Sequence, residues 1–333
     1  MRAMILAAGL GTRLRPLSDL RAKPALPVRG RPVICLLLEF LARQGCREIM
    51  INLHHLPDTI RTAIDADHPK DTDIHFSDEP KPLGTGGGIR RAADFLRESE
   101  ACIVLAGDML IDVPLRALYE RHLTSGRHAT LLLRRDSRDE DFGTIGVDAK
   151  GNMRRIGQQR VAGPTSSKRA DDGDEISRGL FTGVRFFSRE VLDNWPGGSA
   201  TDVFEDLRDW LVPGVETRGE RVGAEIMEAE TSVWEPVGTP AEYLRVNLSP
   251  PDLPTLGGSA AHWGGEIDVT GENQDVIVSR KAFVPADARL ERCVVWDGER
   301  VPPGFHGRDG IFAGGAFRSC QEATKKKSTE KIH

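Results

Sequence analysis

The chain has 333 residues, of which 39% are hydrophobic and 29% are charged, which predicts one large globular domain with a smaller one. The formal net charge of −5 argues against nucleic acid or a membrane surface as the main partner, and no apolar run reaches the length of a membrane span. The five cysteines are scattered and form no C-x-x-C pair, so we expect reduced thiols in a cytoplasmic protein, with no disulfide framework or zinc site.

Strand-like and helix-like segments alternate from the first residues onward. Short apolar runs predict strands at Arg2–Ala7, Glu48–Leu53, Asp73–Phe76 and Ala101–Leu105. Helical periods predict helices between and after them, at Pro32–Gln44, Pro57–Ala66, Gly88–Arg97 and Val113–Thr124. Asp112 has the residue type of an N-cap for the last of these helices. The alternation predicts an α/β fold with a Rossmann-like, mostly parallel sheet sandwiched by helices.

The pattern becomes less regular after this point. Strands are predicted at Ala129–Leu133, Thr144–Val147 and Leu180–Phe187, and helices at Asp202–Leu211 and Ala241–Leu248. A proline-rich break at Ser249–Pro254 follows the last helix. We therefore expect a large domain at residues 1–248 and a second region at residues 249–320.

Apolar residues recur every six positions in this second region, at Val278, Val284, Leu290 and Trp296. Such a repeat, with small residues four positions on, is typical of a left-handed parallel β-helix. The repeat covers little more than one coil, so an ordinary β-rich tail is the alternative. An apolar coil of this kind is a candidate surface for homo-oligomer formation. Residues 321–333 contain a run of lysines and are predicted to form a disordered basic tail.

The most informative segment joins the first predicted strand to a glycine-rich loop. The apolar run Met4–Ala8 continues into Gly9-Leu10-Gly11-Thr12-Arg13, and Lys23 follows with Pro24. A buried strand that ends in such a loop presents backbone N–H groups to a phosphate. A dinucleotide-binding G-x-G-x-x-G turn is disfavoured, because Leu14 replaces the third glycine and prolines replace the helix that should follow. No Gly-Lys-Ser/Thr follows, which excludes a Walker A loop.

This segment resembles the signature of the sugar-1-phosphate nucleotidylyltransferases, roughly L-A-A-G-x-G-T-R-L-x-P-x(n)-K-P-x-x-P. The matching positions are Leu6, Ala7, Ala8, Gly9, Gly11, Thr12, Arg13, Leu14, Pro16, Lys23, Pro24 and Pro27. The resemblance continues more weakly to about Asn247, so it implies that residues 1–248 form a nucleotidyltransferase domain. The implied reaction joins an NTP and a sugar 1-phosphate into an NDP-sugar with release of pyrophosphate, a step of polysaccharide or cell-envelope biosynthesis.

Such a reaction needs groups that neutralise and align phosphates rather than a strong base, because a phosphate monoester is already largely dianionic near neutral pH. The resemblance implies that Arg13 binds the β- and γ-phosphates and that Lys23 reaches the α-phosphate, both as catalytic residues. It implies nucleotide binding along the first loop, at Leu6, Ala8, Gly9, Gly11, Thr12 and Arg13.

Two further segments extend the resemblance. Gly107-Asp108 follows an apolar strand and resembles the family's Gly-Asp pair, so Asp108 is expected to be catalytic and to bind Mg²⁺, with a plain turn aspartate as the alternative. The loop Leu83–Gly88 resembles the family's L-G-T-x-G segment, which borders the base and ribose. The implied nucleotide contacts are Leu83, Gly84, Thr85 and Gly86. The loop is more similar to the heptose-, mannose- and N-acetylmuramate-1-phosphate branches than to the glucose-1-phosphate branches, and it does not determine the base.

The sugar site is implied by weaker matches. Gly143, in Phe142-Gly143-Thr144, resembles an aromatic-Gly element at the sugar, and Thr182 and Gly183 stand where many members have a related turn. Both segments also suit ordinary strands and turns. Many relatives have a Glu-Lys pair whose lysine holds the sugar phosphate, whereas this chain has Gln158-Gln159, and Arg160 is the candidate replacement.

A second departure concerns the metal. Relatives usually read W-x-D-V-G-T, in which the aspartate is the second metal ligand, whereas this chain reads Trp234-Glu235-Pro236-Val237-Gly238-Thr239. Proline cannot coordinate a metal through its side chain. The neighbouring Glu235 is the candidate ligand, although a shift of one residue on an extended chain points a side chain to the opposite face.

Two functions therefore remain open. The first is an active nucleotidylyltransferase, with guanylyl transfer to mannose- or heptose-1-phosphate ahead of uridylyl transfer to an amino-sugar 1-phosphate. The second is a catalytically weakened paralogue that binds a nucleotide or NDP-sugar and regulates a partner, which Pro236 and Gln159 support. The hexad repeat alone would suggest an acyltransferase, but the region is too short for a full β-helix active site.

Overall fold

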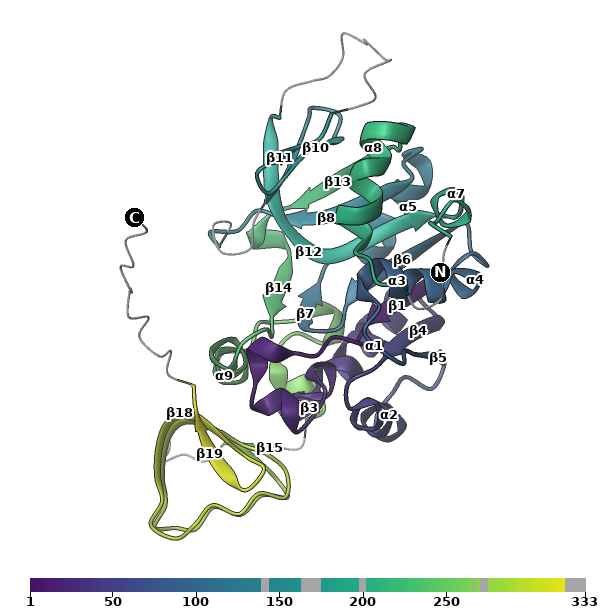
Figure 1. Ribbon diagram of the computed structural model, residues 1–333. Coiled ribbons are helices and arrows are strands. Elements are labelled where there is room, and N and C mark those ends of the chain that lie inside the picture. The colour runs from purple at the N-terminus through teal and green to yellow at the C-terminus, as the bar shows by residue number, and fades with distance from the viewer. Residues whose placement is uncertain (139–143, 163–174, 198–201, 266, 270–274, 321–333) are drawn as a thin grey trace, which may run out of the picture.

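The computed structural model describes residues 1–138, 144–162, 175–197, 202–265, 267–269 and 275–320. Its largest feature is a sheet of ten strands in the order β11-β10-β9-β12-β6-β1-β4-β5, with β8 paired to β12 and β13 (Figure 1). The strands are β1 Arg2–Leu6, β4 Glu48–Leu53, β5 Asp73–Asp78, β6 Ala101–Ala106, β8 Ala129–Arg134, β9 Thr144–Val147, β10 Met153–Ile156, β11 Gln159–Arg160, β12 Ser177–Ser188 and β13 Val222–Met227.

The centre of this sheet is parallel. β5, β4, β1 and β6 all run in one direction, and β12 enters antiparallel beside β6. The helices that flank the sheet are α1 Val33–Arg43, α2 Pro57–Ala66, α3 Gly84–Arg91, α4 Ala93–Leu96, α5 Leu115–Thr124, α7 Arg189–Asp193 and α8 Val212–Arg218. A further helix, α9 Pro240–Leu248, packs against the C-terminal strands. The predicted α/β fold with a mostly parallel sheet between helices is confirmed.

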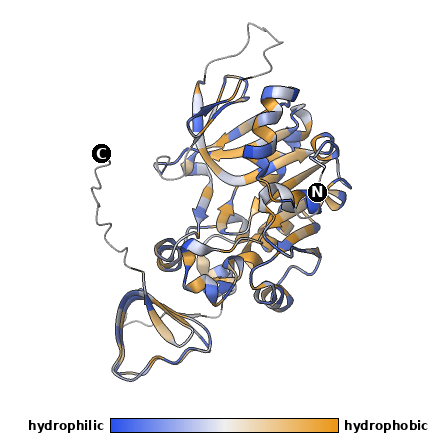
Figure 2. Cartoon of the chain, in the orientation of Figure 1, coloured by the Kyte–Doolittle hydropathy of each residue, from blue (hydrophilic) through white to orange (hydrophobic). Residues whose placement is uncertain are grey.

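Both faces of the central strands are buried. Ala3 and Ile5 of β1 pack into one hydrophobic cluster with α1, whereas Met4 between them points into a second cluster on the other face. A strand covered on both sides needs apolar residues at every position, which explains the continuous apolar run that the sequence shows. Figure 2 shows the apolar residues gathered on these strands and on the helices packed against them.

One predicted helix begins later than expected. Residues 202–205 are not helical, and a π-helix, Asp206–Leu211, then leads into α8. The backbone of Phe204 is already used by the second glycine-rich loop: its N–H donates to Leu83 O at 3.1 Å, and its carbonyl accepts from Gly86 N at 3.0 Å. A peptide group bonded to another segment cannot also close a helical turn.

The prediction that Asp112 is the N-cap of α5 was wrong. Pro114 occupies the N-cap position of α5, and no side chain caps it. The Asp112 carboxylate instead accepts hydrogen bonds from the backbone N–H and the hydroxyl of Thr255, at 2.6 and 2.8 Å. It therefore ties the first domain to the segment that follows the proline-rich break.

Two small antiparallel pairs complete the N-terminal part. β2 Pro27–Val28 pairs with β3 Arg31–Pro32, and β7 Met109–Asp112 pairs with β14 Val233–Pro236. Short 3-10 turns lie at Thr12–Leu14, Leu17–Asp19, Lys23–Ala25, Ala229–Thr231, Pro254–Leu256 and Ala260–His262.

The C-terminal region is a separate sheet of β15 Ile267–Val269, β16 Val276–Ser279, β17 Arg289–Val295, β18 His306–Ala313 and β19 Ala316–Ser319. β16, β17 and β18 are parallel, and Val278 pairs with Val295, which pairs with Phe312. These strands wind into a triangular coil (Figure 1).

Alternate residues on the parallel strands of this sheet pack into two different hydrophobic cores. Val278, Val295 and Phe312 pack inside the coil, whereas Ile277 and Val294 join the main hydrophobic cluster of the N-terminal part. The coil is therefore fixed to the first domain by apolar contacts as well as by chain connection.

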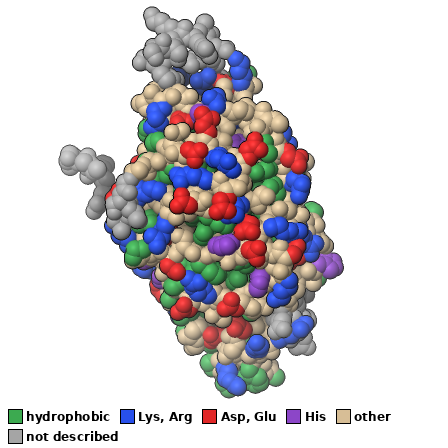
Figure 3. Space-filling model, turned by 90° about the vertical axis from the view of Figure 1, so that its right-hand side faces the viewer, with side chains coloured by type: hydrophobic (Ala, Val, Ile, Leu, Met, Phe, Trp, Pro, Cys, Tyr) green, Lys and Arg blue, Asp and Glu red, His purple; other side chains and the backbone are tan. Residues whose placement is uncertain are grey.

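The cysteines are buried without disulfide bonds, and the surface carries charges of both signs. All five cysteines are buried and unpaired, and burial raises the pKa of Cys35, Cys46, Cys102 and Cys320 to about 12. Figure 3 shows acidic and basic side chains interspersed over one face of the molecule. Among the described residues, every helix is too short or too polar to cross a bilayer.

Candidate active site

A cavity of about 400 Å³ lies at the carboxyl ends of the parallel strands. In the sheet, Leu6 of β1 pairs with Asn52 of β4 and with Ala106 of β6, and all three residues line the cavity. Open parallel sheets bind ligands at this edge, because the loops that leave neighbouring strands converge there.

The first glycine-rich loop forms one wall. Leu6, Ala8 and Gly9 line the cavity, and a Cβ built on Gly9 would have no atom within 4 Å, so its backbone is open to a ligand. Gly11 then adopts a left-handed conformation with a φ of 62°, and the chain turns into the 3-10 helix Thr12–Leu14 outside the cavity lining.

Lys23 and Asp108 meet inside the cavity. The Lys23 ammonium lies 2.5 Å from an Asp108 carboxylate oxygen, and the two side chains are 11% and 38% exposed. Lys23 begins the 3-10 turn Lys23–Ala25, and Asp108 lies between β6 and β7. The two charges neutralise each other, and a phosphate and its cation would offer each a new partner of opposite charge.

Arg13 lies outside the cavity lining. Its side chain is exposed, and its Nη2 atom is 3.5 Å from the position that a Cβ of Gly238 would occupy, beside the start of α9. Arg13 has no hydrogen-bond or ion-pair partner within the part of the chain that the structure describes, so its charge is available to a ligand.

The second glycine-rich loop forms the opposite wall through Leu83, Gly84 and Thr85. Gly84 has a φ of 73°, and a Cβ there would lie 2.6 Å from the carbonyl oxygen of Phe204. The Glu205 carboxylate accepts from the Thr85 hydroxyl at 2.7 Å and from the Thr85 N–H at 3.2 Å.

Gly86 does not line the cavity. It is covered by the ring of Phe204, into which a Cβ at Gly86 would project. Its small size is required by packing between the loop and residues 202–206, a requirement that the motif alone did not indicate.

Two polar residues missed by the sequence reasoning join the two loops. The Asn52 side chain accepts from Ala7 N–H at 2.8 Å and donates to Glu79 at 2.7 Å. The other oxygen of Glu79 accepts from Leu83 N–H at 3.0 Å. Asn52 and Glu79 are only 3% and 4% exposed. The signal that could have found Asn52 is a polar residue near the end of an otherwise apolar strand.

The third wall comes from β12. Gly183 lines the cavity, whereas Thr182 is 3% exposed and its hydroxyl donates to Leu132 O at 2.8 Å. Arg185 also lines the cavity and binds the buried Asp206 through two hydrogen bonds, of 2.5 and 3.0 Å. Burial alone would raise the pKa of Asp206, but the Arg185 guanidinium outweighs it and holds the pKa below its usual value.

The remaining expected residues lie elsewhere. Gly143 is outside the described residues, and Arg160 is exposed on the edge strand β11. Glu235 is also outside the cavity lining, and its carboxylate binds Arg138 at 3.1 Å and Arg245 at 2.5 Å. To serve as a metal ligand, Glu235 would have to give up these two arginines.

The donor set does not build a metal site held by the protein alone. Within the described ranges, no three His, Cys, Asp or Glu side chains are grouped to hold a metal ion. Pro236 pairs with Met109 across β14 and β7, and Val237 N–H donates to Asp108 O at 2.8 Å, so the proline stands directly beside the single candidate ligand. One carboxylate suits a cation that arrives on the phosphates of a nucleotide.

Comparison with known proteins shows the family to which the chain belongs. The nucleotidyl transferase family model matches residues 2–250. A mannose-1-phosphate guanylyltransferase of Mycobacterium tuberculosis is 28% identical over 315 residues, which cover 91% of this chain and 81% of that protein. A UTP–glucose-1-phosphate uridylyltransferase of Synechocystis is 30% identical over 224 residues, which cover 64% of this chain and 55% of that protein.

Solved structures show the same fold. The structure of HddC from Yersinia pseudotuberculosis complexed with GMP-PN aligns with a TM-score of 0.59 at 23% identity, over 74% of this chain and 97% of that chain. The family model covers the strand, both glycine-rich loops and the Lys23–Asp108 pair, and so confirms the resemblance that the sequence showed. This chain belongs to the nucleotidyl transferase family.

Proposed function

We propose that this protein transfers a guanylyl group from GTP to mannose 1-phosphate or heptose 1-phosphate, which gives a GDP-sugar and pyrophosphate. The observation that carries the proposal is the Lys23–Asp108 pair, set between two glycine-rich loops at the carboxyl edge of a parallel sheet. The choice of guanine is supported by the name of the mycobacterial relative and by the nucleotide analogue in the HddC structure, and the choice of mannose by the name of that relative. The choice of heptose rests on the resemblance of the loop Leu83–Gly88.

The proposed nucleotide lies between the two loops. Backbone N–H groups near Gly9 face its phosphates, and Leu83–Thr85 border the base and ribose. Lys23 would exchange Asp108 for a phosphate oxygen, and Asp108 is the residue that would hold the Mg²⁺ that accompanies the triphosphate. Bound there, Mg²⁺ would neutralise charge on the phosphates.

The chemistry follows from this placement. A phosphate oxygen of the sugar 1-phosphate forms a bond to the α-phosphorus, and the bond from that phosphorus to the bridging oxygen breaks, so that pyrophosphate leaves. Lys23 compensates negative charge near the α-phosphate. Arg13, which has no partner in the described structure, is proposed to bind the β- and γ-phosphates.

The sugar is proposed to bind beside Gly183, which lines the cavity. Gly143 and Arg160 stay predictions for this subsite, and Thr182 would contribute through its backbone, because its hydroxyl is already bonded within the core. Homo-oligomer formation through the C-terminal coil also stays a proposal.

The test is pyrophosphate release with Mg²⁺ from GTP, UTP, dTTP, CTP and ATP against a panel of sugar 1-phosphates. We expect GTP with mannose- or heptose-1-phosphate to turn over fastest. Asp108→Asn should lower kcat/KM by about a hundredfold. Asp78→Asn is the matched control, because Asp78 is an exposed carboxylate at the end of β5 that pairs with Arg61. Turnover by Asp108→Asn at the wild-type rate would contradict the assignment.

A catalytically weakened paralogue is the second candidate, and one observation favours it. Pro236 stands beside Asp108, where a second carboxylate would complete the cation site. Binding of GTP or a GDP-sugar without turnover across the whole panel would support this candidate and exclude the enzyme.

A further inference from the structure

A buried ion pair lies in the wall of the nucleotide cavity, between two segments of the chain. The Arg185 guanidinium of β12 binds Asp206, the first residue of the π-helix, through hydrogen bonds of 2.5 and 3.0 Å. The two side chains are only 4% and 2% exposed. Two charges are costly to remove from water, and an apolar pair of similar volume is often as stable. The pair therefore indicates a role beyond stabilisation of the fold.

On one side, the pair is joined to the second glycine-rich loop. The Thr85 hydroxyl lies 2.5 Å from Asp206 Oδ1, and it accepts from the Asp206 N–H at 3.1 Å. Thr85 also lines the cavity, on the wall proposed for the base and ribose. A nucleotide that binds against this wall therefore limits the movement of the residue that holds Asp206.

On the other side, the pair is joined to the turn of β12 that forms the third wall. Arg185 Nη1 donates to Gly183 O at 2.9 Å. Gly183 has a φ of 86°, and the pairing of β12 with β8 shifts its register between Phe181 and Arg185. A bulged residue is left out of the regular hydrogen-bond ladder, so side-chain contacts such as that of Arg185 hold it in place. Gly183 lines the cavity where the sugar is proposed to bind.

A continuous chain of hydrogen bonds therefore runs from the nucleotide wall to the sugar wall, through Thr85, Asp206, Arg185 and Gly183. The Nε, Nη1 and Nη2 atoms of Arg185 each donate to a protein oxygen, which suits a role in holding protein segments rather than a phosphate. We propose that Arg185 is a positioning residue that links the two substrate sites, so that a bound nucleotide sets the β12 turn for the sugar phosphate. The inference rests on the proposed function, which supplies the two substrates.

The expected consequence is that each substrate binds more tightly when the other is present. The first ligand to bind orders the β12 turn, so the second ligand no longer has to supply the free energy for that ordering. Linkage is reciprocal, so each substrate must raise the affinity for the other by the same factor. Couplings between sites typically correspond to about 5- to 150-fold in affinity, so we expect an effect of about fivefold or more.

The test is calorimetry with an analogue of GTP that has a methylene group in place of the oxygen between the α- and β-phosphates. Pyrophosphate cannot leave from this analogue, so both ligands can occupy the protein together with Mg²⁺ present. We expect saturating mannose 1-phosphate to raise the affinity for the analogue about fivefold or more, and the analogue to raise the affinity for mannose 1-phosphate by the same factor.

The informative variant combines Arg185→Met with Asp206→Leu, because it removes both charges together and leaves neither buried without a partner. We expect the ratio of the affinities with and without the second ligand to fall to about one. Arg185→Lys keeps a charge opposite Asp206 but lacks the planar guanidinium that also reaches Gly183, so its ratio should lie below that of wild type. Arg61→Met with Asp78→Leu is the matched control, because this pair also has two hydrogen bonds, of 2.7 and 2.8 Å, and neither residue lines the cavity.

Hydrogen exchange gives a second readout that needs no sugar phosphate. The analogue alone should slow the exchange of backbone N–H groups in β12, both in wild type and in the control variant. In the Arg185→Met/Asp206→Leu protein, the same ligand should change the exchange of β12 much less, because the contact between the loop and the strand is absent.

The proposal is overturned by a ratio of one in wild type that binds both ligands, or by unchanged exchange of β12 in wild type with the analogue bound. It is also overturned if the ratio is the same in wild type and in the Arg185 variants, because a role limited to folding lowers both affinities and leaves their ratio unchanged. The proposed function is tested by pyrophosphate release instead. A protein that turns over without this linkage loses only the linkage, and a protein with the linkage but without turnover loses only the assignment as an enzyme.

Discussion

Replacement of Asn52 by leucine should damage stability and nucleotide binding together. Asn52 is the link between the two glycine-rich loops, because it accepts from Ala7 N–H and donates to Glu79. Leucine has a similar volume but offers neither a donor nor an acceptor. Ala7 N–H and one oxygen of Glu79 would then be buried without partners.

The expected size follows from those two losses. An unsatisfied buried N–H costs about 1–3 kcal/mol, and a carboxylate that loses one of its donors costs about as much or more, so we expect about 4 kcal/mol in total. Both groups are nearly inaccessible to water, as Asn52 and Glu79 are 3% and 4% exposed, so solvent cannot replace the lost partner without rearrangement. The loops would also lose their fixed spacing, and the affinity for GTP should fall.

The assay is urea unfolding, combined with calorimetry of GTP binding. Asn194→Leu is the control, because Asn194 is an exposed asparagine at the end of α7. Asn52→Asp keeps an acceptor for Ala7 N–H but sets a second carboxyl group against Glu79, so it should also be destabilised, and most strongly above the pKa of the new group. An Asn52→Leu protein within about 1 kcal/mol of wild type would refute the assigned role of this network.

Three further changes test other parts of the structure. Burial lowers the pKa of His122 to about 4 from 6.5, so the folded state favours the neutral ring, and stability should fall by about 3 kcal/mol as the pH drops from 6.5 to 4. His122→Gln should flatten that part of the unfolding free energy plotted against pH, and an unchanged slope would contradict the burial argument. Gly86→Ala should destabilise the protein by about 2 kcal/mol in urea unfolding, because its Cβ projects into the Phe204 ring; no loss would show that the ring moves freely. Pro236→Asp should raise kcat/KM at limiting Mg²⁺ about tenfold, because it adds a carboxylate beside Asp108; a rate equal to wild type would mean that one protein ligand suffices.

The fold class and the position of the site were readable in the linear order of residues. Met4–Ala8 predicts a strand, the glycines after it predict a loop, and Gly107-Asp108 follows another apolar run. Carboxyl ends of parallel strands meet at one edge of a sheet, so local patterns were enough to bring Asp108 to the first loop. In the structure, Lys23 and Asp108 form an ion pair within the cavity at that edge.

The partners of polar side chains depended on the tertiary structure. Asn52 meets Glu79, Arg185 meets Asp206, and Asp112 binds Thr255 instead of capping the helix that follows it. Each partner comes from another segment of the chain, so a local sequence pattern does not predict which residue will pair with a given polar side chain.

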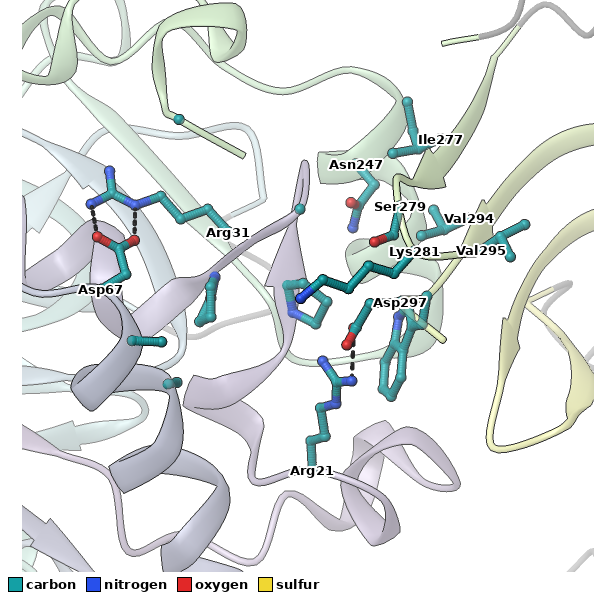
Figure 4. Close-up of a pocket in the computed structure, with 17 residues that line it drawn as sticks. Arg21, Arg31, Asp67, Asn247, Ile277, Ser279, Lys281, Val294, Val295 and Asp297 are labelled. Atoms are coloured by element: carbon teal, nitrogen blue, oxygen red, sulfur yellow. Dashed lines mark hydrogen bonds and ion pairs between the residues drawn. The ribbon is translucent and has the colours of Figure 1, made fainter. Parts of the chain in front are cut away.

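The roles of individual glycines and the presence of a cavity likewise depended on the tertiary structure. The second loop could be recognised from its sequence, but only packing against residues 202–206 shows that Gly86 contacts the Phe204 ring while Gly84 and Thr85 line the cavity. A second cavity, lined by Lys281 and Arg21 among others, has no motif at all, since it exists only where the C-terminal coil closes against the first domain (Figure 4). Backbone propensity and hydrophobic period act over a few residues and can be read along a chain, whereas side-chain pairing and enclosed volume arise only when separate segments share the same space.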